Sequence, residues 1–576
     1  MKQSIQQRIL SYISDFFSPV IQVIRSISQT HFKTAIFVII PVIFLINAVI
    51  VHYHYGVFYQ DTVDPEYFHM YNGIAIGGGN LAVEYIVHPA TTLEFFMAIS
   101  ARIIHPFQPN DYYIKDFIND PEKYIHSANL FMNIILSIVL FFGGYYSMKR
   151  SESILIGLLF QLILFSNSSL LILTGRLIPE TIMILPLLLI CLMVIKNVDS
   201  NNTSGYISDM VLYGLIIGFG IAYKLSFIPV ILIPLIILKT SFGKKLKFLG
   251  YTILFTALFA YPIVFNISTF WEWISEVAGE SSRHDINRSF IDLSLIPENF
   301  KTLFNFDKTF FFIMLFSLLL NFLFSTRTFK NKGLYHSNTV RSIFAVNITI
   351  ILCIALILKR FALHYFMPFY VFKYLLIILS AVLIARLQII IKLCQFKTIV
   401  FVLFSILAIS ISFGQIEKTK STIERLIERK ELQQQKLCMI TSLIKPDSPI
   451  IISGKYSGTP FIEFAHHSDY MMTYHLKGYF KDYLMEKFPK TFQYVAWSDK
   501  FYFWDNYVDF NHILKKTEDT FYVYIGKGKK KDLAEIEKRI SKSEIKDIVS
   551  TKVLYENTTE DEMLIEFHIN SGKDQY

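Results

Sequence analysis

The stretch TAIFVIIPVIFLINAVIV, residues 34–51, decides the fold class of this chain, because it contains no charged side chain over the length of a membrane-spanning helix. An α-helix of about 20 such residues spans the hydrocarbon core of a bilayer. Similar apolar runs follow at 128–147, 152–173, 178–195, 247–266, 309–325, 341–358, 365–385 and 397–414, and the run 211–239 is long enough for two spans. The sequence therefore predicts a polytopic α-helical membrane protein with about eleven transmembrane helices.

The composition agrees with this class. Of 576 residues, 53% are hydrophobic and 18% are charged, and the mean hydropathy is +0.42, which is too apolar for a soluble protein with a polar surface. Basic loops on one side of the membrane account for the formal net charge of +9, so the charge does not indicate a nucleic-acid partner. The four cysteines have neither the spacing of a metal site nor that of a disulfide framework.

The basic residues predict the orientation of the spans. With the N-terminus in the cytoplasm, the basic loops near 149–150, 196, 239–247, 327–341 and 386–397 all lie on the cytoplasmic side, as the positive-inside rule expects. An odd number of spans then places the C-terminus outside. The loop around Asp64, the segments 176–180 and 359–365 and the loop 267–308 all fall on the outer face, where they can share one site.

Three regions follow from the composition along the chain. We expect an amphipathic cytoplasmic leader at 1–33 ahead of a retained anchor, a transmembrane core at 34–414, and an extracytoplasmic α/β domain at 415–576. In that domain the pattern predicts strands at 450–453 and 521–526, a helix at 532–541 and two closing strands around a turn at 557–559.

The first outer loop holds the most informative polar residues. It contains QDTVDPEY at 60–67, and HPATTLEFF at 88–96 opens a half-apolar segment that we predict as a helix at the outer interface over 91–104. Ionised carboxylates near hydrocarbon are costly, so a cluster of them there indicates a water-filled cavity or a reaction.

Several short motifs, in this order and on one side of the membrane, resemble those of the GT-C superfamily of integral-membrane glycosyltransferases. The likeness is to the protein O-mannosyltransferases and the lipid A aminoarabinose transferases. It is carried by DPEYFHMYNGIAIGGGNL (64–81), the His-Pro pair at 88–89, GRLIPE (175–180), GLIIGFGIAYKLSFIP (214–229) and KRFALHYFMPF (359–369). The resemblance covers residues 34–414. It implies transfer of a sugar from a polyprenyl-phosphate carrier, with inversion, to an acceptor on the outer face.

This chemistry requires a general base for the acceptor hydroxyl, which a partly desolvated carboxylate supplies. Asp64 is the candidate that matches the family pattern and Asp61 is the alternative, although Asp64-Pro65 could also cap the next helix. Glu180 matches a second outer acidic residue that would orient the acceptor or a basic partner, or it is placed by the helix dipole. Glu66, Tyr67 and His88 complete the predicted acceptor loop.

The leaving polyprenyl phosphate requires cationic groups aimed at its growing negative charge. Lys224, alone between apolar segments, needs a phosphate or carboxylate partner, and Arg176 could pair with Glu180 or with the donor phosphate. Basic residues at a membrane edge also reach toward lipid headgroups without any catalytic duty. The predicted donor-phosphate set is Lys359, Arg360, His364, Tyr365, Lys224, Arg176, Arg283 and Arg288. A divalent cation could bridge carboxylate and phosphate, but no spacing requires one.

Two other functions are compatible with these residues. The chain could transport or flip a lipid-linked saccharide, or bind a ligand through its outer domain. The favoured glycosyltransferase would have as partners a polyprenyl-phosphate sugar, membrane lipids and a glycolipid, glycan or protein acceptor. The Lys-, Ile-, Phe- and Asn-rich composition is typical of AT-rich bacterial genomes and favours the bacterial inner membrane.

Overall fold

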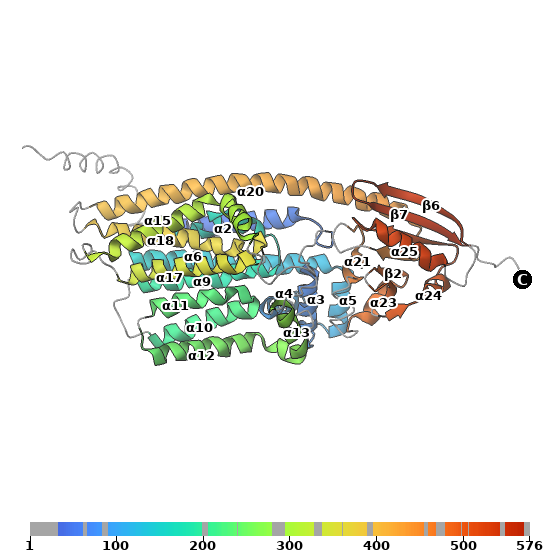
Figure 1. The fold of residues 1–576 in the computed structure, drawn as a ribbon, viewed down its shortest axis with the longest axis horizontal. Helices are drawn as coiled ribbons and strands as arrows, with labels where there is room; N and C mark the ends of the chain where they lie inside the picture. Colours follow the sequence, from blue (N-terminus) through green and yellow to red (C-terminus); the bar gives the residue numbers. More distant parts are fainter. Residues whose placement is uncertain are drawn as a thin grey trace, which may run out of the picture.

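A bundle of long helices and a mixed β-sheet make up the protein, with the sheet beyond one end of the bundle (Figure 1). A computed structural model describes residues 33–60, 66–82, 90–198, 206–238, 240–278, 294–327, 337–359, 361–388, 395–453, 459–467, 479–496, 498–504, 506–541 and 548–569. The predicted leader lies outside these residues, apart from Lys33.

Seven of the described helices are long and apolar enough to cross a membrane. They are α2 (Lys33–Tyr55), α6 (Pro121–Ser151), α9 (Pro179–Val198), α15 (Lys308–Ser325), α17 (Ser337–Lys359), η5 with α18 (Met367–Tyr370 and Val371–Ala385) and α20 (Phe396–Ser442). An eighth span is formed by α12 (Phe242–Phe259) if it is counted with η3 (Tyr261–Asn266) and α13 (Ile267–Ala278), which follow it after a bend of 66°. The predicted polytopic helical class is confirmed.

The other predicted spans contain shorter apolar helices. Among the described helices, fewer than the predicted eleven are therefore long and apolar enough to cross a membrane. These are α7 (Ile154–Gln161), η1 (Leu162–Ser166), α8 (Ser168–Leu173), α10 (Tyr206–Tyr223), η2 (Leu225–Ile231) and α11 (Leu232–Ile237). Each break has a local cause. Asn167 is extended and caps α8 by accepting a hydrogen bond from Ser169 N, and the extended backbone of Lys224 ends α10.

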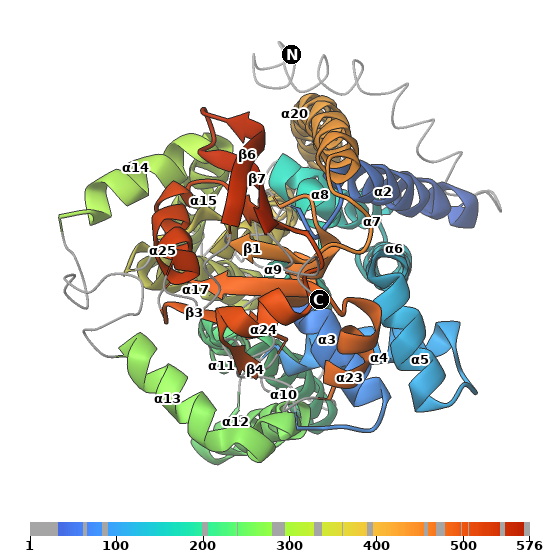
Figure 2. The same ribbon diagram turned by 90° about the vertical axis from the view of Figure 1, so that its right-hand side faces the viewer.

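Short helices lie where the bundle meets the sheet. They are α3 (Glu66–Gly77), α4 (Thr91–Ile104) and α5 (Asn110–Asn119), and α4 has the bounds of the predicted interfacial helix. Figure 1 shows α3 and α5 across the direction of the long helices. Gly73 allows α3 to pack closely on α4, since a Cβ at Gly73 would stand 2.7 Å from Met97 Cβ. On another side, α13 and α14 (Ile296–Phe306) lie at the edge of the bundle (Figure 2).

The C-terminal part contains a seven-stranded sheet of order β4-β3-β2-β1-β5-β7-β6. Its strands are β1 (Ile450–Ser453), β2 (Thr491–Val495), β3 (Lys500–Phe503), β4 (Asn506–Val508), β5 (Thr520–Ile525), β6 (Ile548–Asn557) and β7 (Glu562–Ile569). β1 is parallel to β2 and β5, and the outer pairs are antiparallel. Its helices are α21 (Ile462–His467), α23 (Lys481–Lys487), α24 (Phe510–Lys515) and α25 (Lys530–Ser541). We call Ile450–Ile569 the sheet domain; it has the α/β character and the strands predicted at 450–453, 521–526 and around 557–559.

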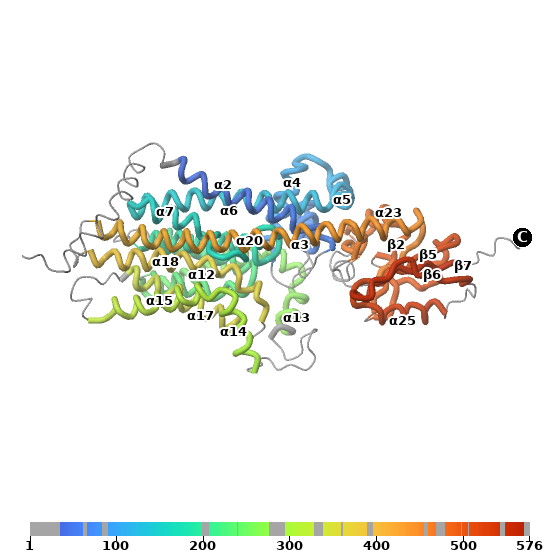
Figure 3. The backbone as a smooth tube through the Cα atoms, turned by 90° about the horizontal axis from the view of Figure 1, so that it is seen from above, coloured from blue at the N-terminus to red at the C-terminus, as the bar shows by residue number. Residues whose placement is uncertain are grey.

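The helix α20 connects the two parts. It runs for 47 residues, through Gly414, where the composition changes, and continues from the bundle to the sheet domain without a break (Figure 3). A long helix followed by the short segment 443–449 therefore joins the bundle to the sheet domain.

Polar contacts fix the sheet domain on the short helices. Tyr483 Oη donates to Asp111 Oδ1 at 2.7 Å, and Lys487 Nζ donates to Asn119 Oδ1 at 2.8 Å. Tyr71, on α3, is hydrogen-bonded to His466 Nδ1. Because Tyr71 is buried against Phe480 and Phe117 as well, the contact is part of a packed interface.

The His466 contact predicts a pH dependence. Burial lowers the pKa of His466 to about 3, with Lys487 and His467 nearby adding to the effect, whereas an unfolded histidine titrates near 6.5. The neutral imidazole is therefore fully stabilising above about pH 6.5, and this stability is lost as the pH falls toward 3. At pH 5 the loss is about 2 kcal/mol. Thermal unfolding of the purified protein should show a lower Tm at pH 5 than at pH 7.

The variant His466→Gln, which cannot take up a proton, separates this residue from other titrating groups. The pKa of His467 is also lowered to about 3, so part of the pH dependence should remain. We expect the variant to lose about half as much stability as the wild type between pH 7 and pH 5. Equal pH slopes in the two proteins would contradict the assignment to His466.

Candidate active site

A buried ion pair joins the first outer loop to the GRLIPE motif. Glu66 begins α3 and is fully buried, and its Oε1 and Oε2 accept hydrogen bonds from Arg176 Nε at 2.7 Å and Nη2 at 3.1 Å. The pairing is bidentate, the geometry that a planar guanidinium matches to a carboxylate. The preceding residue, Gly175, is held through its carbonyl oxygen, 2.7 Å from His52 Nδ1. Arg176, which we expected to pair with Glu180 or a phosphate, thus pairs with Glu66.

A second buried ion pair lies on the same motif. Glu180 is in the first turn of α9, and its Oε1 is bonded to Lys224 Nζ; the two side chains are 0% and 7% exposed. The Lys224 ammonium also lies 3.9 Å from the ring centroid of Tyr365, within the range of a cation–π contact. The partner that the isolated Lys224 requires is therefore the Glu180 carboxylate. Residues 44 to 185 positions apart are brought together.

Beside these pairs lies a cavity of about 600 Å³ with a strongly basic lining. Its basic residues are Arg176, His364, Lys418 and Arg425, and four hydroxyl groups come from Ser168, Ser169, Ser421 and Thr422. The remaining lining residues are Tyr55, Ile172, Leu173, Ile178, Phe306 and Met367. Among the described residues that line it there is no aspartate or glutamate. The cavity can hold an anion attached to an apolar group, since donors and apolar walls face the same space.

The structure brings some of the predicted site residues together and does not describe others. Glu66, Arg176, Glu180, Lys224, His364 and Tyr365 lie at the two ion pairs or in the cavity wall. Tyr67 is one residue away, and its hydroxyl donates to Glu122 Oε1 at 3.1 Å. Lys359 ends α17, and only its backbone is described. Asp61, Asp64, His88, Arg283, Arg288 and Arg360 lie outside the described residues.

Comparison with known proteins gives a likeness in fold only. No protein-family model matches the sequence. No curated protein matches it either. Among solved structures, the chain is similar to ArnT from Cupriavidus metallidurans bound to undecaprenyl phosphate, with 10% identity and a TM-score of 0.47 over 91% of this chain and 97% of that chain. It is similar to the apo state of ArnT from Cupriavidus metallidurans at 9% identity and a TM-score of 0.46, with the same coverage.

Sequence reasoning missed two basic residues of the cavity, Lys418 and Arg425. Both were assigned to the outer domain because they follow the change in composition near Gly414. A usable signal was present, since positions 418, 421, 422 and 425 follow the i, i+3, i+4, i+7 spacing of one helix face. That face combines two cations and two hydroxyls directly after a membrane span. Glu122, a half-buried carboxylate that also accepts a hydrogen bond from Phe58 N at 3.0 Å, was missed as well.

Metal binding was left open by the sequence. Within the described ranges, no group of three or more His, Cys, Asp or Glu side chains is placed to hold a metal ion.

The Glu180–Lys224 pair predicts a large loss of stability in Lys224→Gln. The substitution leaves a buried carboxylate without its counter-charge, which costs about 3 kcal/mol or more. The Tm of the detergent-purified variant should fall clearly, and the second substitution Glu180→Gln should restore most of the loss. Lys196→Gln is the matched control, because Lys196 pairs with Asp209 but is 36% exposed, and such pairs contribute about 1 kcal/mol or less. Equal losses in the two single variants would contradict this prediction.

Proposed function

We propose that this protein is a glycosyltransferase of the bacterial inner membrane that transfers a sugar from a polyprenyl-phosphate donor to an acceptor on the extracytoplasmic face. The observation that carries the proposal is the cavity, in which four basic side chains and an apolar wall surround one space. A polyprenyl phosphate has the matching parts, since a charged phosphate is attached to a hydrocarbon chain.

The donor would bind with its phosphate toward Arg176, His364, Lys418 and Arg425. The cavity lies among helices that are apolar enough to cross a membrane, so the isoprenoid chain can lie along Ile172, Leu173 and Met367. Glu66 would hold the guanidinium plane of Arg176 in place. Lys418, Arg425 and the Glu66-paired Arg176 are cations, and no carboxylate is among the described lining residues, which favours an anionic leaving group over a neutral ligand.

The proposed reaction is a single displacement. The acceptor hydroxyl oxygen attacks the anomeric carbon of the sugar, and the bond from that carbon to the phosphate oxygen breaks with its electron pair remaining on the phosphate. The hydroxyl proton passes to a carboxylate, for which Asp64 is our candidate and Asp61 the alternative. Attack from the side opposite the phosphate inverts the anomeric centre. The basic cavity residues stabilise the charge that grows on the phosphate, while Glu180 and Lys224 support the adjoining turn.

Transfer of radiolabelled sugar from a panel of polyprenyl-phosphate sugars to acceptors in membrane extracts tests the proposal. The purified wild type should move label to a lipid, glycan or protein. Lys418→Gln/Arg425→Gln should raise the KM for the donor at least about tenfold, because two charge-assisted contacts to the phosphate are lost. The control Lys420→Gln removes a cation from the same helix at an exposed position that does not line the cavity.

Two outcomes would overturn the proposal. The first is a wild type that consumes no donor in the panel. The second is a wild type that moves a lipid-linked sugar across liposomes without covalent transfer, which would indicate a flippase.

A further inference from the structure

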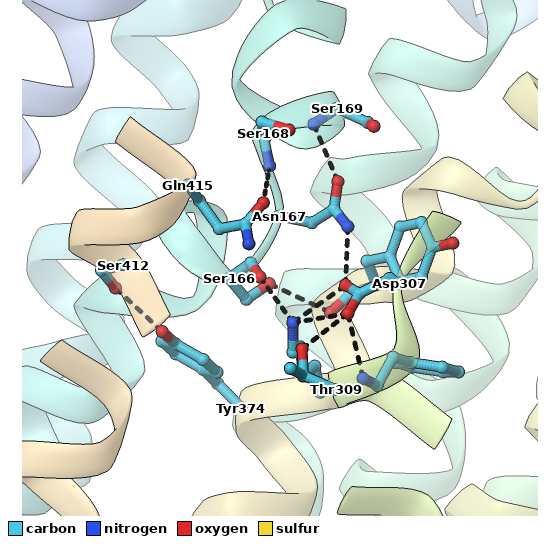
Figure 4. Close-up of polar contacts among 12 residues, drawn as sticks. Ser166, Asn167, Ser168, Ser169, Asp307, Thr309, Tyr374, Ser412 and Gln415 are labelled. Atoms are coloured by element: carbon cyan, nitrogen blue, oxygen red, sulfur yellow. Dashed lines mark hydrogen bonds and ion pairs between the residues drawn. The ribbon is translucent and has the colours of Figure 1, made fainter. Parts of the chain in front are cut away.

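A third buried ion pair lies near the cavity, at the junction of α14 and α15. Lys373 Nζ, on α18, is 2.8 Å from Asp307 Oδ2 and 3.1 Å from Oδ1, and the side chains are 0% and 4% exposed (Figure 4). Neither residue lines the cavity. Two opposite charges buried among membrane-spanning helices carry a large desolvation cost, so ion pairs of this kind mark places with a specific task.

The ion pair is bonded to the segment that begins α8. Asn167 Nδ2 donates to Asp307 Oδ2 at 2.7 Å, and Lys373 Nζ donates to the carbonyl oxygen of Ser166 at 3.0 Å. Asn167 also caps α8 through its other side-chain atom, with Ser169 N 2.8 Å from Oδ1. Asp307 therefore fixes the residue that starts the helix carrying the cavity residues Ser168 and Ser169.

The same network reaches the other walls of the cavity. Phe306, which precedes Asp307, lines the cavity, and Met367 begins the segment that leads into Lys373. Gln415 Oε1, on α20, accepts a hydrogen bond from Ser168 N at 2.9 Å and lies one turn before Lys418. Figure 4 shows the bond between Gln415 and Ser168 next to the bonds from Asp307 through Asn167 to Ser169, and consecutive residues of the chain join the two sets. The walls from α8, α14, η5 and α20 are thus all tied to one ion pair.

We infer that Asp307 and Lys373 are positioning residues for the donor phosphate site, holding the α8 hydroxyls and the α20 cations at the spacing that binds a lipid-linked phosphate. The inference rests on the proposed function. Neither residue touches the cavity, so they act through Asn167, Ser168 and Gln415. Lys373 also interacts electrostatically with Lys418 in the cavity wall, and Asp307 offsets the positive charge of Lys373 that would otherwise repel Lys418.

The double variant Asp307→Asn/Lys373→Met tests this inference. Both charges are removed together, so no unpaired buried charge remains, and asparagine can still cap α15 as Asp307 does through Phe310 N. We expect a folded protein in which the KM for the donor rises about tenfold or more while kcat at saturating donor stays within about threefold. The thermal shift produced by undecaprenyl phosphate, measured without any sugar, should be reduced in parallel.

The control Ser412→Ala/Tyr374→Phe removes two other buried hydrogen bonds between α18 and α20, from the Tyr374 hydroxyl to Ala408 O at 2.5 Å and to Ser412 Oγ at 2.8 Å, that lie outside this network. It should keep the wild-type KM. If the double variant does not fold, Gln415→Leu decides, because it breaks only the bond between α8 and α20 and should also raise the donor KM.

Measurements on the wild type distinguish the proposed function from the positioning role of Asp307 and Lys373. A wild type with no thermal shift and no transfer overturns the proposed function, and the inference with it. A wild type that binds undecaprenyl phosphate, together with a folded double variant or Gln415→Leu of unchanged KM and thermal shift, overturns the inference alone. A Ser412→Ala/Tyr374→Phe control with the same rise in KM would also overturn it, since any loosening of α18 and α20 would then suffice.

Discussion

Arg176→Gln is expected to lower sugar transfer by about 10²- to 10³-fold, the usual effect of losing one preorganised donor to a developing negative charge. Arg176 lines the cavity and also belongs to the buried ion pair with Glu66. Its loss removes a cation from the proposed phosphate site and frees Glu66. The measurement is kcat/KM for the donor in the labelled-sugar assay.

The substitution also affects folding, because Glu66 would be left buried without a partner. Glu66→Gln/Arg176→Gln removes both charges and should recover the Tm without recovering transfer. Arg176→Lys keeps the charge but not the planar fork, so it should lie between the wild type and Arg176→Gln. Arg341→Gln, at an exposed position at the start of α17, serves as the control for loss of a positive charge. Transfer that returns with the Tm in the double variant would show that Arg176 acts through stability alone.

The fold was predictable where one local signal decides each element. Long runs such as 34–51 must be helices in a membrane, because only internal hydrogen bonding satisfies the backbone there. The change in composition near Gly414 does not coincide with a break in the helix, since α20 stays helical across it. A glycine inside a helix costs about 1 kcal/mol, which the flanking helix formers and the contacts of Arg429 and Lys430 with the end of α2 can offset.

Strands were predicted unevenly for a similar reason. β1, β5, β6 and β7 have clear alternation or turn signals, whereas the aromatic segments of β2 and β3, TFQYV and KFYF, do not stand out in a chain with so many aromatic residues. Sheet order depends on pairing partners far apart in the chain, which one sequence does not reveal.

The site was predicted by residue type but not by pairing. Glu66 and Lys224 were indicated by the cost of charge near hydrocarbon, and Arg176 and Glu180 by the resemblance of GRLIPE to a family motif. Which carboxylate meets which cation depends on contacts across 110 and 44 positions. Lys373 carries the same signal as Lys224, a lone lysine within an apolar run, and that signal identifies it as the partner of a buried acid.

Asp64→Asn is expected to reduce kcat by about 10²- to 10⁴-fold, the range that general base catalysis contributes. An acceptor hydroxyl is a poor nucleophile, and an asparagine amide cannot take its proton. Because the donor phosphate is bound elsewhere in the proposed mechanism, the thermal shift with undecaprenyl phosphate should stay at the wild-type value. The experiment compares single-turnover transfer and thermal shift in Asp64→Asn, Asp61→Asn and the wild type.

The comparison assigns the base, because both substitutions remove one negative charge from the same loop and differ only in position. If Asp64 is the base, Asp61→Asn should keep transfer within about tenfold, and transfer by Asp64→Asn should not recover at high pH, because no carboxylate remains to ionise. A large loss in Asp61→Asn with near-normal turnover in Asp64→Asn would reverse the assignment. Near-normal turnover in both would place the base among the other acidic residues of the site, and Glu180, buried beside Lys224, would then be the first to test.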